Sequence, residues 1–243
     1  MTAKEIVLVH GAWHGPWCWD QVAAALRDDG FTVSTPALPG HDAPGSRSRT
    51  WNTIASYVDA VGAAVEACAT PPILVGHSMG GYCVQRYLET QVAPAAILVA
   101  SVPRRGALAA NLRAVREYPG PALTSTVLGD YSRLVGSPEL VRALFFTEHT
   151  DQAVVDAAYA QLQNESAFAI MTMLFRLPRP AEISTPVHVV GATDDHLFTV
   201  AEQRDLAEAY GVEPTFLDGG HDLMLDSSWP ELAAHIAMIA RSS

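Results

Sequence analysis

The sequence contains almost no lysine, few cysteines and no long apolar run. Lys4 is the only lysine among 15 basic residues, which stand against 26 acidic ones, and the formal net charge is −11. A strongly acidic chain binds nucleic acids and anionic membrane surfaces poorly, so we expect neither as a partner. The three cysteines are an odd number without metal-ligand spacing, which argues against a disulfide framework and against a zinc site.

The sequence also lacks the patterns of membrane spans, signal peptides, metal sites and nucleotide-binding loops. No segment approaches the roughly 18 to 20 apolar residues of a membrane-spanning helix, and the first residues lack the basic stretch and apolar run of a signal peptide. We therefore expect a soluble cytoplasmic protein. No two histidines with His-x-x-x-His spacing are expected on one helical face, where they could bind a metal together. The glycines at 11–15 follow a strand but lack the G-x-G-x-x-G spacing of a dinucleotide loop. The chemistry should need neither a metal nor another cofactor.

The strongest positive signal is a serine set among glycines. The segment Gly76-His77-Ser78-Met79-Gly80-Gly81 follows an apolar run at 72–75 and precedes an amphipathic stretch at 82–88. A serine hydroxyl is a weak nucleophile, so it has to sit on a strained turn with space beside it for a base and for backbone donors. The small residues at 76, 80 and 81 provide that space. The pattern predicts Ser78 as a catalytic nucleophile.

Two other segments supply what such a serine needs. Strand-like residues 5–9 run into His10-Gly11-Ala12-Trp13-His14-Gly15, which is typical of an oxyanion loop. Backbone N–H groups are the usual donors to the oxygen of a tetrahedral intermediate, and we assign this role to Ala12 and Met79. Near the end of the chain, a short strand is followed by Gly219-Gly220-His221. His221 is therefore the expected general base.

The remaining catalytic group should be an acid that fixes the histidine tautomer. Asp194 and Asp195 both follow the apolar run at 187–191 and precede His221. The chain order Ser, Asp, His resembles that of the α/β hydrolases. Read from Asp195, the sequence Asp-x-Leu-x-Thr resembles that family's Asp-x-apolar-x-Pro turn, whereas Asp194 fits a Gly-x-x-Asp pattern. We favour Asp195 and keep Asp194 as the alternative.

Strands and helices alternate along most of the chain. Short apolar runs rich in β-branched residues predict buried strands at 5–9, 31–35, 72–76, 95–100, 187–191 and 214–217. Helical periodicity covers 17–27, 51–68, 81–88, 201–210 and 229–240. This alternation predicts an α/β fold with a doubly wound, mostly parallel sheet of six strands.

The alternation stops between 103 and 180. Helical stretches replace it at 108–118, 138–146, 152–162 and 167–174. Eight arginines and seven acidic residues give 101–180 a formal charge of +1, whereas the rest of the chain carries −12. We therefore predict a helical cap over 103–180 on a core formed by 1–102 and 181–243. A cap supplies most of a substrate pocket, and the candidate substrate-binding residues are Trp13, His77, Phe145 and Phe168.

A closer resemblance is carried by the segment from His10 to Trp19. Its sequence HGAWHGPWCW resembles the HGAxHGxWxW stretch of plant methylesterases and hydroxynitrile lyases, a branch of the α/β hydrolases. The resemblance implies Ser78, Asp195 and His221 as the triad, with Ala12 and Met79 as oxyanion donors. It covers most of the predicted core and does not extend to the cap, so it transfers no substrate.

The branch contains two reaction classes. Its lyases look to use a lysine directly after the catalytic histidine and a threonine after the His-Gly pair, where this sequence has Asp222 and Ala12. A carboxylate beside departing cyanide would repel it. We therefore expect a serine hydrolase that cleaves a small to medium carboxylic ester through an acyl-enzyme. The alternatives are lyase or C–C bond-cleaving chemistry on the same triad and a catalytically slow ligand receptor; a homodimer is one option for the assembly.

Overall fold

The computed structural model describes residues 4–46 and 51–243. At its centre lies a parallel sheet of six strands in the order β2-β1-β3-β4-β5-β6. The strands are β1 (Glu5–Val9), β2 (Thr32–Ser34), β3 (Ile73–His77), β4 (Ala96–Val99), β5 (Val187–Ala192) and β6 (Thr215–Leu217). The predicted α/β fold with a doubly wound sheet of six strands is confirmed, and each predicted strand overlaps an observed one.

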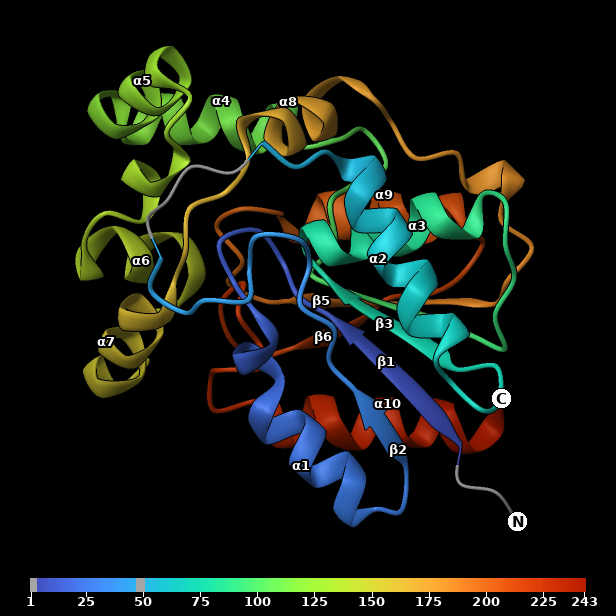
Figure 1. Ribbon diagram of the computed structural model, residues 1–243. Coiled ribbons are helices and arrows are strands. Elements are labelled where there is room, and N and C mark those ends of the chain that lie inside the picture. Colours follow the sequence, from blue (N-terminus) through green and yellow to red (C-terminus); the bar gives the residue numbers. More distant parts are fainter. Residues whose placement is uncertain (1–3, 47–50) are drawn as a thin grey trace.

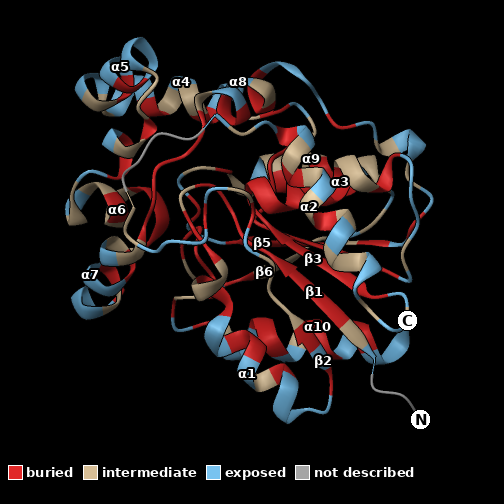
Figure 2. Ribbon diagram, viewed as in Figure 1, coloured by how far each residue is buried: buried red, intermediate tan, exposed pale blue. Residues whose placement is uncertain are grey.

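The strands are apolar because helices cover both faces of the sheet. One face packs against α1 (Asp20–Asp28) and α10 (Trp229–Ser242), and the other against α2 (Ile54–Glu66), α3 (Met79–Leu88) and α9 (Val200–Ala209) (Figure 1). Figure 2 shows that the buried residues lie along the strands and on the inner sides of these helices. The sheet is therefore the buried middle layer of three.

Between β4 and β5 the chain forms five α-helices beyond the carboxyl ends of the strands (Figure 1). They are α4 (Leu108–Glu117), α5 (Pro119–Leu128), α6 (Pro138–Phe145), α7 (Gln152–Gln161) and α8 (Ala167–Phe175). The sequence predicted four of them and missed α5. The division into a cap at 103–180 and a core at 1–102 and 181–243 stays a prediction, and residues 1–3 and 47–50 of that core lie outside the described residues.

One apolar cluster extends from the sheet into these helices. Val9 of β1 and Leu74 of β3 belong to the same packed cluster as Val155 of α7 and Ile170 of α8. The opposite face of the sheet has its own cluster, which includes Val22 of α1. The helices after β4 therefore share their core with one side of the sheet.

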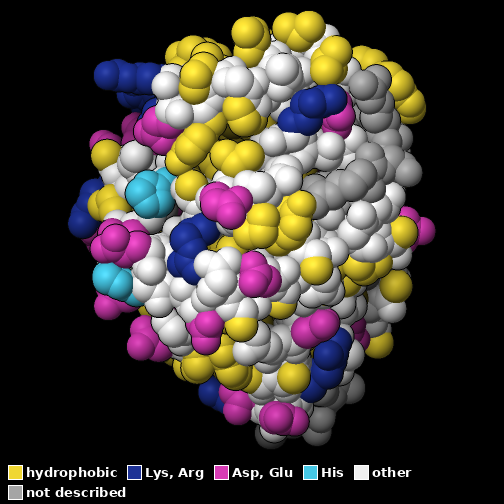
Figure 3. Space-filling view, turned by 90° about the vertical axis from the view of Figure 1, so that its left-hand side faces the viewer, with side chains coloured by type: hydrophobic (Ala, Val, Ile, Leu, Met, Phe, Trp, Pro, Cys, Tyr) yellow, Lys and Arg dark blue, Asp and Glu magenta, His cyan; other side chains and the backbone are white. Residues whose placement is uncertain are grey.

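The outer surface of the same helices carries exposed apolar side chains. Figure 3 shows hydrophobic groups gathered over the upper part of this face, where α4 and α5 lie. Leu112, Leu123, Val127 and Phe175 are each more than half exposed. Across the described ranges 4–46 and 51–243, every helix is too short or too polar to cross a membrane.

Candidate active site

The candidate site lies where the strand order of the sheet reverses. β1 has β2 on one side and β3 on the other, and in such sheets the crevice outside the carboxyl ends at the reversal binds ligands. The described non-glycine residues with positive φ are Trp13 (64°), Ser78 (53°) and Ala100 (40°), which follow β1, β3 and β4. Such conformations cost of order 1–3 kcal/mol each and concentrate at functional sites.

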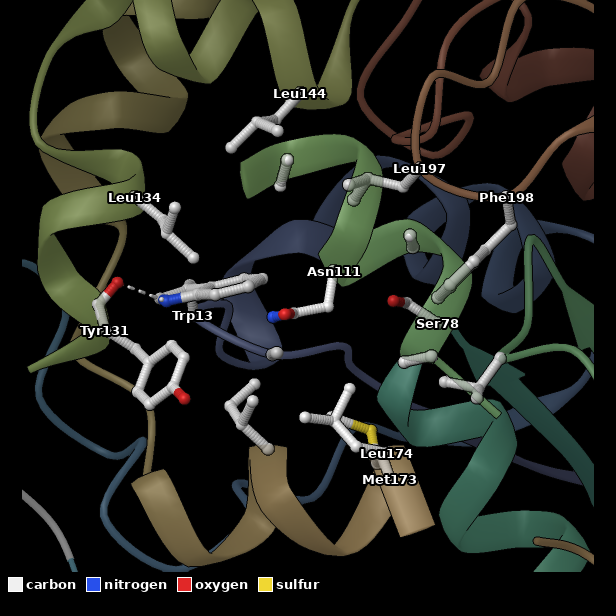
Figure 4. Close-up of a pocket in the computed structure, with 16 residues that line it drawn as sticks. Trp13, Ser78, Asn111, Tyr131, Leu134, Leu144, Met173, Leu174, Leu197 and Phe198 are labelled. Carbon is white, nitrogen blue, oxygen red and sulfur yellow. Dashed lines mark hydrogen bonds between the residues drawn. The ribbon is translucent and has the colours of Figure 1, made fainter. Parts of the chain in front are cut away.

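Ser78 occupies the turn between β3 and α3. A Cβ atom on Gly76 would lie 2.6 Å from the carbonyl oxygen of Gly80, and one on Gly80 would collide with the carbonyl oxygen of Val9. The glycines thus let β1, β3 and α3 meet more closely than side chains would allow. The Ser78 hydroxyl does not cap α3, and it faces a cavity (Figure 4).

His221 is hydrogen-bonded to Asp195, whereas Asp194 is exposed at the surface. The distance from His221 Nδ1 to Asp195 Oδ2 is 2.8 Å. The other carboxylate oxygen of Asp195 accepts the backbone N–H groups of Leu197 at 2.8 Å and Phe198 at 2.9 Å. These bonds fix the carboxylate so that it holds one tautomer of the imidazole. The geometry favours Asp195 over the alternative.

His221 is almost fully buried, at 1% exposed. Burial lowers the pKa of His221, but the charge and hydrogen bond of Asp195, with the charge of Asp222, raise the pKa above its ordinary value overall. The ring lies 4.7 Å from the ring of His77, the residue before Ser78. Within the described chain no hydrogen bond joins the Ser78 hydroxyl to this ring. Such bonds are often long in ligand-free sites.

His77 contacts the loop at 218–222 that contains His221, which we call the histidine loop. It is completely buried, and burial together with the neighbouring His221 holds the pKa of His77 well below its usual range. The neutral ring donates its Nε2–H to the carbonyl oxygen of His221 at 3.1 Å. His77 was predicted to bind substrate, but it does not line the cavity; its hydrogen bond instead goes to the backbone of His221.

Asp222 points into the protein and pairs with His14. Its Oδ2 lies 2.9 Å from His14 Nε2, and its Oδ1 lies 3.6 Å from His77 Nε2. Burial raises the pKa of Asp222, but these two histidines bring it below its ordinary value overall. His14 Nδ1 donates to the carbonyl oxygen of Ala12 at 2.8 Å. The pair therefore joins the histidine loop to the oxyanion loop.

Two histidines and an aspartate near the catalytic turn have the composition of a metal site. Ligand atoms of His77, His221 and Asp222 lie within 4.8 Å of one another. However, His77 Nε2 already donates to a carbonyl oxygen and Asp222 Oδ2 already accepts from His14. We interpret this group as a hydrogen-bonded support for His221.

The oxyanion loop is held from its other side by the segment 163–165. The N–H of Trp13 lies 3.4 Å from Glu165 Oε2, and the carbonyl oxygen of Trp13 accepts the N–H of Gln163 at 2.7 Å. Glu165 also accepts the hydroxyl of Tyr57 at 2.7 Å and lies 3.1 Å from His41 Nε2. Burial lowers the pKa of His41, but Glu165 raises it overall. These contacts fix Trp13 in its left-handed conformation.

The two predicted oxyanion donors are Ala12, in the loop after β1, and Met79, which follows Ser78 in the turn after β3. Met79 is the first residue of α3, so its N–H is one of the free donors at the start of a helix. Ala12 and Ser78 both line the cavity. A Cβ atom on Gly11 would lie only 3.0 Å from the Cβ of Ser78. The backbone of the oxyanion loop therefore runs directly beside the nucleophile.

An apolar cavity of about 80 Å³ opens in front of Ser78 (Figure 4). Of the predicted substrate-binding residues, Trp13 lines it and the other three do not. Phe145 is buried behind Trp13, with ring centroids 5.9 Å apart. Phe168 is 52% exposed on the outer side of α8. The structure therefore places Phe145 in the core and Phe168 at the surface, and neither lines this cavity.

No local sequence pattern indicated Asn111 or Glu165 as residues of the site. Asn111 is a single polar residue within a helical stretch. Glu165 belongs to the run Gln-Asn-Glu-Ser at 163–166, in which each residue is at most 1% exposed. Polar runs are usually at the surface, so the composition of this run predicts exposure, whereas the run is buried.

Comparisons with known proteins agree with this architecture. Esterase PIR7B of Oryza sativa subsp. japonica is 37% identical over 108 residues, which are 42% of this chain and 40% of that protein. A carbendazim hydrolyzing esterase of Nocardioides sp. (strain SG-4G) is 42% identical over 81 residues, 33% of this chain and 34% of that protein. The chain thus spans about two fifths or less of the length of these curated relatives.

Structural and family comparisons cover more of the chain. The solved structure of a thermophilic esterase from Thermogutta terrifontis matches with a TM-score of 0.77 at 19% identity, over 99% of this chain and 90% of that one. This likeness concerns the fold. A family model described as the alpha/beta hydrolase family matches residues 6–235. The resemblance seen in the sequence is confirmed, and the chain belongs to the alpha/beta hydrolase family.

Proposed function

We propose that the chain is a serine hydrolase that cleaves small carboxylic esters through an acyl-enzyme. The observation that carries the proposal is a strained serine turn that opens on an apolar cavity, beside a buried histidine whose Nδ1 lies 2.8 Å from Asp195. The names of the related esterases support the same reaction class. Ser78, His221 and Asp195 form the proposed catalytic triad.

In the proposed mechanism, His221 accepts the Ser78 proton at Nε2 while Oγ attacks the ester carbonyl carbon. The N–H groups of Ala12 and Met79 stabilise the oxyanion. Asp195 holds the imidazole in position and stabilises its protonated form. The alcohol leaves with the proton from His221, and a water molecule activated by the same ring then hydrolyses the acyl-enzyme.

Ester cleavage fits this site better than lyase chemistry. Among the described residues that line the cavity, none is a lysine or arginine that would stabilise departing cyanide. Asp222, at the position where the lyases look to have lysine, is fully buried and paired with His14. Ester hydrolysis needs no such cation, because the serine, the histidine with its aspartate and the oxyanion donors carry both steps.

Replacing Ser78 by alanine tests the proposal. Ser78→Ala should lower kcat for a short p-nitrophenyl ester by about 10⁴-fold or more, because loss of the nucleophile removes the covalent pathway. Ser227→Ala, at an exposed position outside the site, should keep the wild-type rate. A Ser78→Ala protein that stays folded and turns over near the wild-type rate would refute the mechanism.

Labelling separates an enzyme from a slow ligand receptor. A fluorophosphonate should modify wild-type Ser78 stoichiometrically, with the adduct found by mass analysis of the peptide that contains it. The Ser78→Ala protein should take up none. An inert Ser78 in the folded wild-type protein would favour the receptor.

A further inference from the structure

The cavity in front of Ser78 contains two polar side chains that no other residue in the described part of the chain binds. Sixteen residues line it, and nearly all are apolar. The indole N–H of Trp13 is satisfied by the carbonyl oxygen of Tyr131 at 3.0 Å. By contrast, the amide of Asn111 and the hydroxyl of Tyr131 make no hydrogen bond with any residue in the described part of the chain. A few polar groups in an otherwise apolar pocket are what fix the orientation of a bound ligand.

Asn111 occupies the middle of this cavity. It shares one face of α4 with Ala107, Ala110 and Ala114, which also line the wall. Figure 4 shows its amide lying between Trp13 and Ser78. The three alanines beside it are small and apolar, so the Asn111 amide is the polar group on this part of the wall. Asparagine is a weaker helix former than alanine, and no side-chain hydrogen bond to another described residue offsets that cost.

Tyr131 lies at the far end, beyond Trp13 as seen from Ser78 (Figure 4). It is 98% buried, being 2% exposed. Its hydroxyl therefore meets little water and has no partner among the described residues. The cavity thus offers one hydrogen-bonding group close to the nucleophile and a second one farther away.

Both groups are neutral, and each can donate as well as accept. None of the described residues that line the cavity carries a charged side chain. Arg113, a neighbour on α4, is paired with Glu202 at 2.8 Å. A carboxylate placed here would be desolvated without a counter-charge, whereas a hydroxyl or ketone oxygen would be matched. At about 80 Å³ the cavity is small beside the pockets of roughly 300–1,000 Å³ that hold drug-sized ligands, so it suits a short chain.

We propose that Asn111 is a specificity-determining residue that binds a neutral oxygen on the acyl chain of the substrate. The preferred substrates are then esters of short hydroxy or oxo acids, ahead of plain alkanoates and of half-esters of dicarboxylic acids. The acyl chain is the part concerned because it stays attached to Ser78 through both steps. This inference rests on the proposed ester hydrolysis.

The test compares ethyl esters that differ only in the acyl chain: butanoate, 3-hydroxybutanoate, 3-oxobutanoate and hydrogen succinate. In the wild-type protein, kcat/KM for the hydroxy and oxo esters should exceed that for butanoate by about tenfold. Asn111→Leu keeps the shape of the side chain and removes its hydrogen bonds. This variant should lose about tenfold on the two oxygenated esters, keep or improve the rate on butanoate, and remain poor on succinate.

Glu117→Leu adds the same apolar side chain at an exposed position of α4 and should leave the ranking unchanged. Fluorophosphonate labelling of Ser78 in Asn111→Leu should match wild type, which shows that the nucleophile is intact. Equal kcat/KM for the three neutral esters, or an unchanged ranking in Asn111→Leu, would overturn the inference and leave ester hydrolysis standing. Failure to hydrolyse any of them, with Ser78 unlabelled, would overturn the proposed function as well.

Discussion

At the scale of single residues, His221 is supported from three directions. Asp195 binds its Nδ1, His77 binds its carbonyl oxygen, and Asp222 contributes negative charge from deeper in the protein. Asp195 sets the tautomer of the ring and raises its pKa, His77 sets its position, and Asp222 raises the pKa further. Substitutions at these residues should therefore have distinguishable effects.

The two adjacent aspartates provide the first comparison. Asp195→Asn should lower kcat by about 10⁴-fold, because the amide would favour the wrong tautomer of His221. Asp194→Asn, at an exposed position, should stay close to wild type. Initial rates on one p-nitrophenyl ester are sufficient. Equal and mild losses in both variants would mean that neither residue orients His221.

The pH dependence follows from the raised pKa of His221. The base must be neutral to accept the serine proton, so kcat/KM should rise with pH through that pKa, above the ordinary histidine value of about 6.5. Asp222→Asn removes a negative charge that raises this pKa, so the rise should move to lower pH. Asp218→Asn, an exposed carboxylate in the same loop, is the control. If the rise of kcat/KM in Asp222→Asn occurs at the same pH as in wild type or at a higher pH, Asp222 does not raise the pKa of His221.

At the scale of secondary-structure elements, the segment between α7 and α8 controls the loop after β1. Gln163 and Glu165 bind the carbonyl oxygen and the N–H of Trp13, and Trp13 directly follows the proposed oxyanion donor Ala12. We therefore expect the orientation of the proposed oxyanion N–H to depend on a segment about 150 residues away along the chain. Preorganised donors of this kind lose effect when they can move.

Glu165→Gln tests that dependence, because it keeps the shape and removes the charge. We expect kcat to fall by about tenfold with little change in KM, as for a loss felt mainly in the transition state. The pKa of His41 should fall as well, which a histidine titration followed by NMR would detect. Glu148→Gln, at an exposed site, should change neither. An unchanged kcat together with a lowered His41 pKa would restrict Glu165 to a structural role.

The sequence predicted the elements more fully than their contacts. Its motifs located the serine turn and the histidine loop because those roles need particular residues at particular spacings. α5 was missed because its first turn contains Pro119 and Pro121 and its apolar residues Leu123 and Val127 face solvent. Asn111 and Glu165 depend on which segments meet in three dimensions, and no local pattern records that.

At the scale of the whole molecule, the helices after β4 and one face of the sheet form a single apolar cluster. A cap with a core of its own would unfold separately. Here the buried side chains of α7 and α8 pack in the same cluster as those of β1 and β3. We therefore expect one cooperative unfolding transition.

Matched core substitutions check this expectation. Val155→Ala in α7 and Val22→Ala in α1 each remove a fully buried side chain, and each should cost about 2 kcal/mol of unfolding free energy. Circular dichroism at 222 nm and tryptophan fluorescence should report coincident transitions in both variants. An early, separate transition in Val155→Ala alone would instead indicate an independent cap domain.

The two bonds to Trp13 also limit how chimaeras of this protein can be made. Grafting a foreign set of helices between β4 and β5 to obtain a new selectivity would discard Gln163 and Glu165 along with the old cavity wall. The chimaera would then lose turnover because the loop after β1 is no longer held, whatever the fit of the new pocket. Keeping residues 163–165 of the original chain in the chimaera avoids that loss.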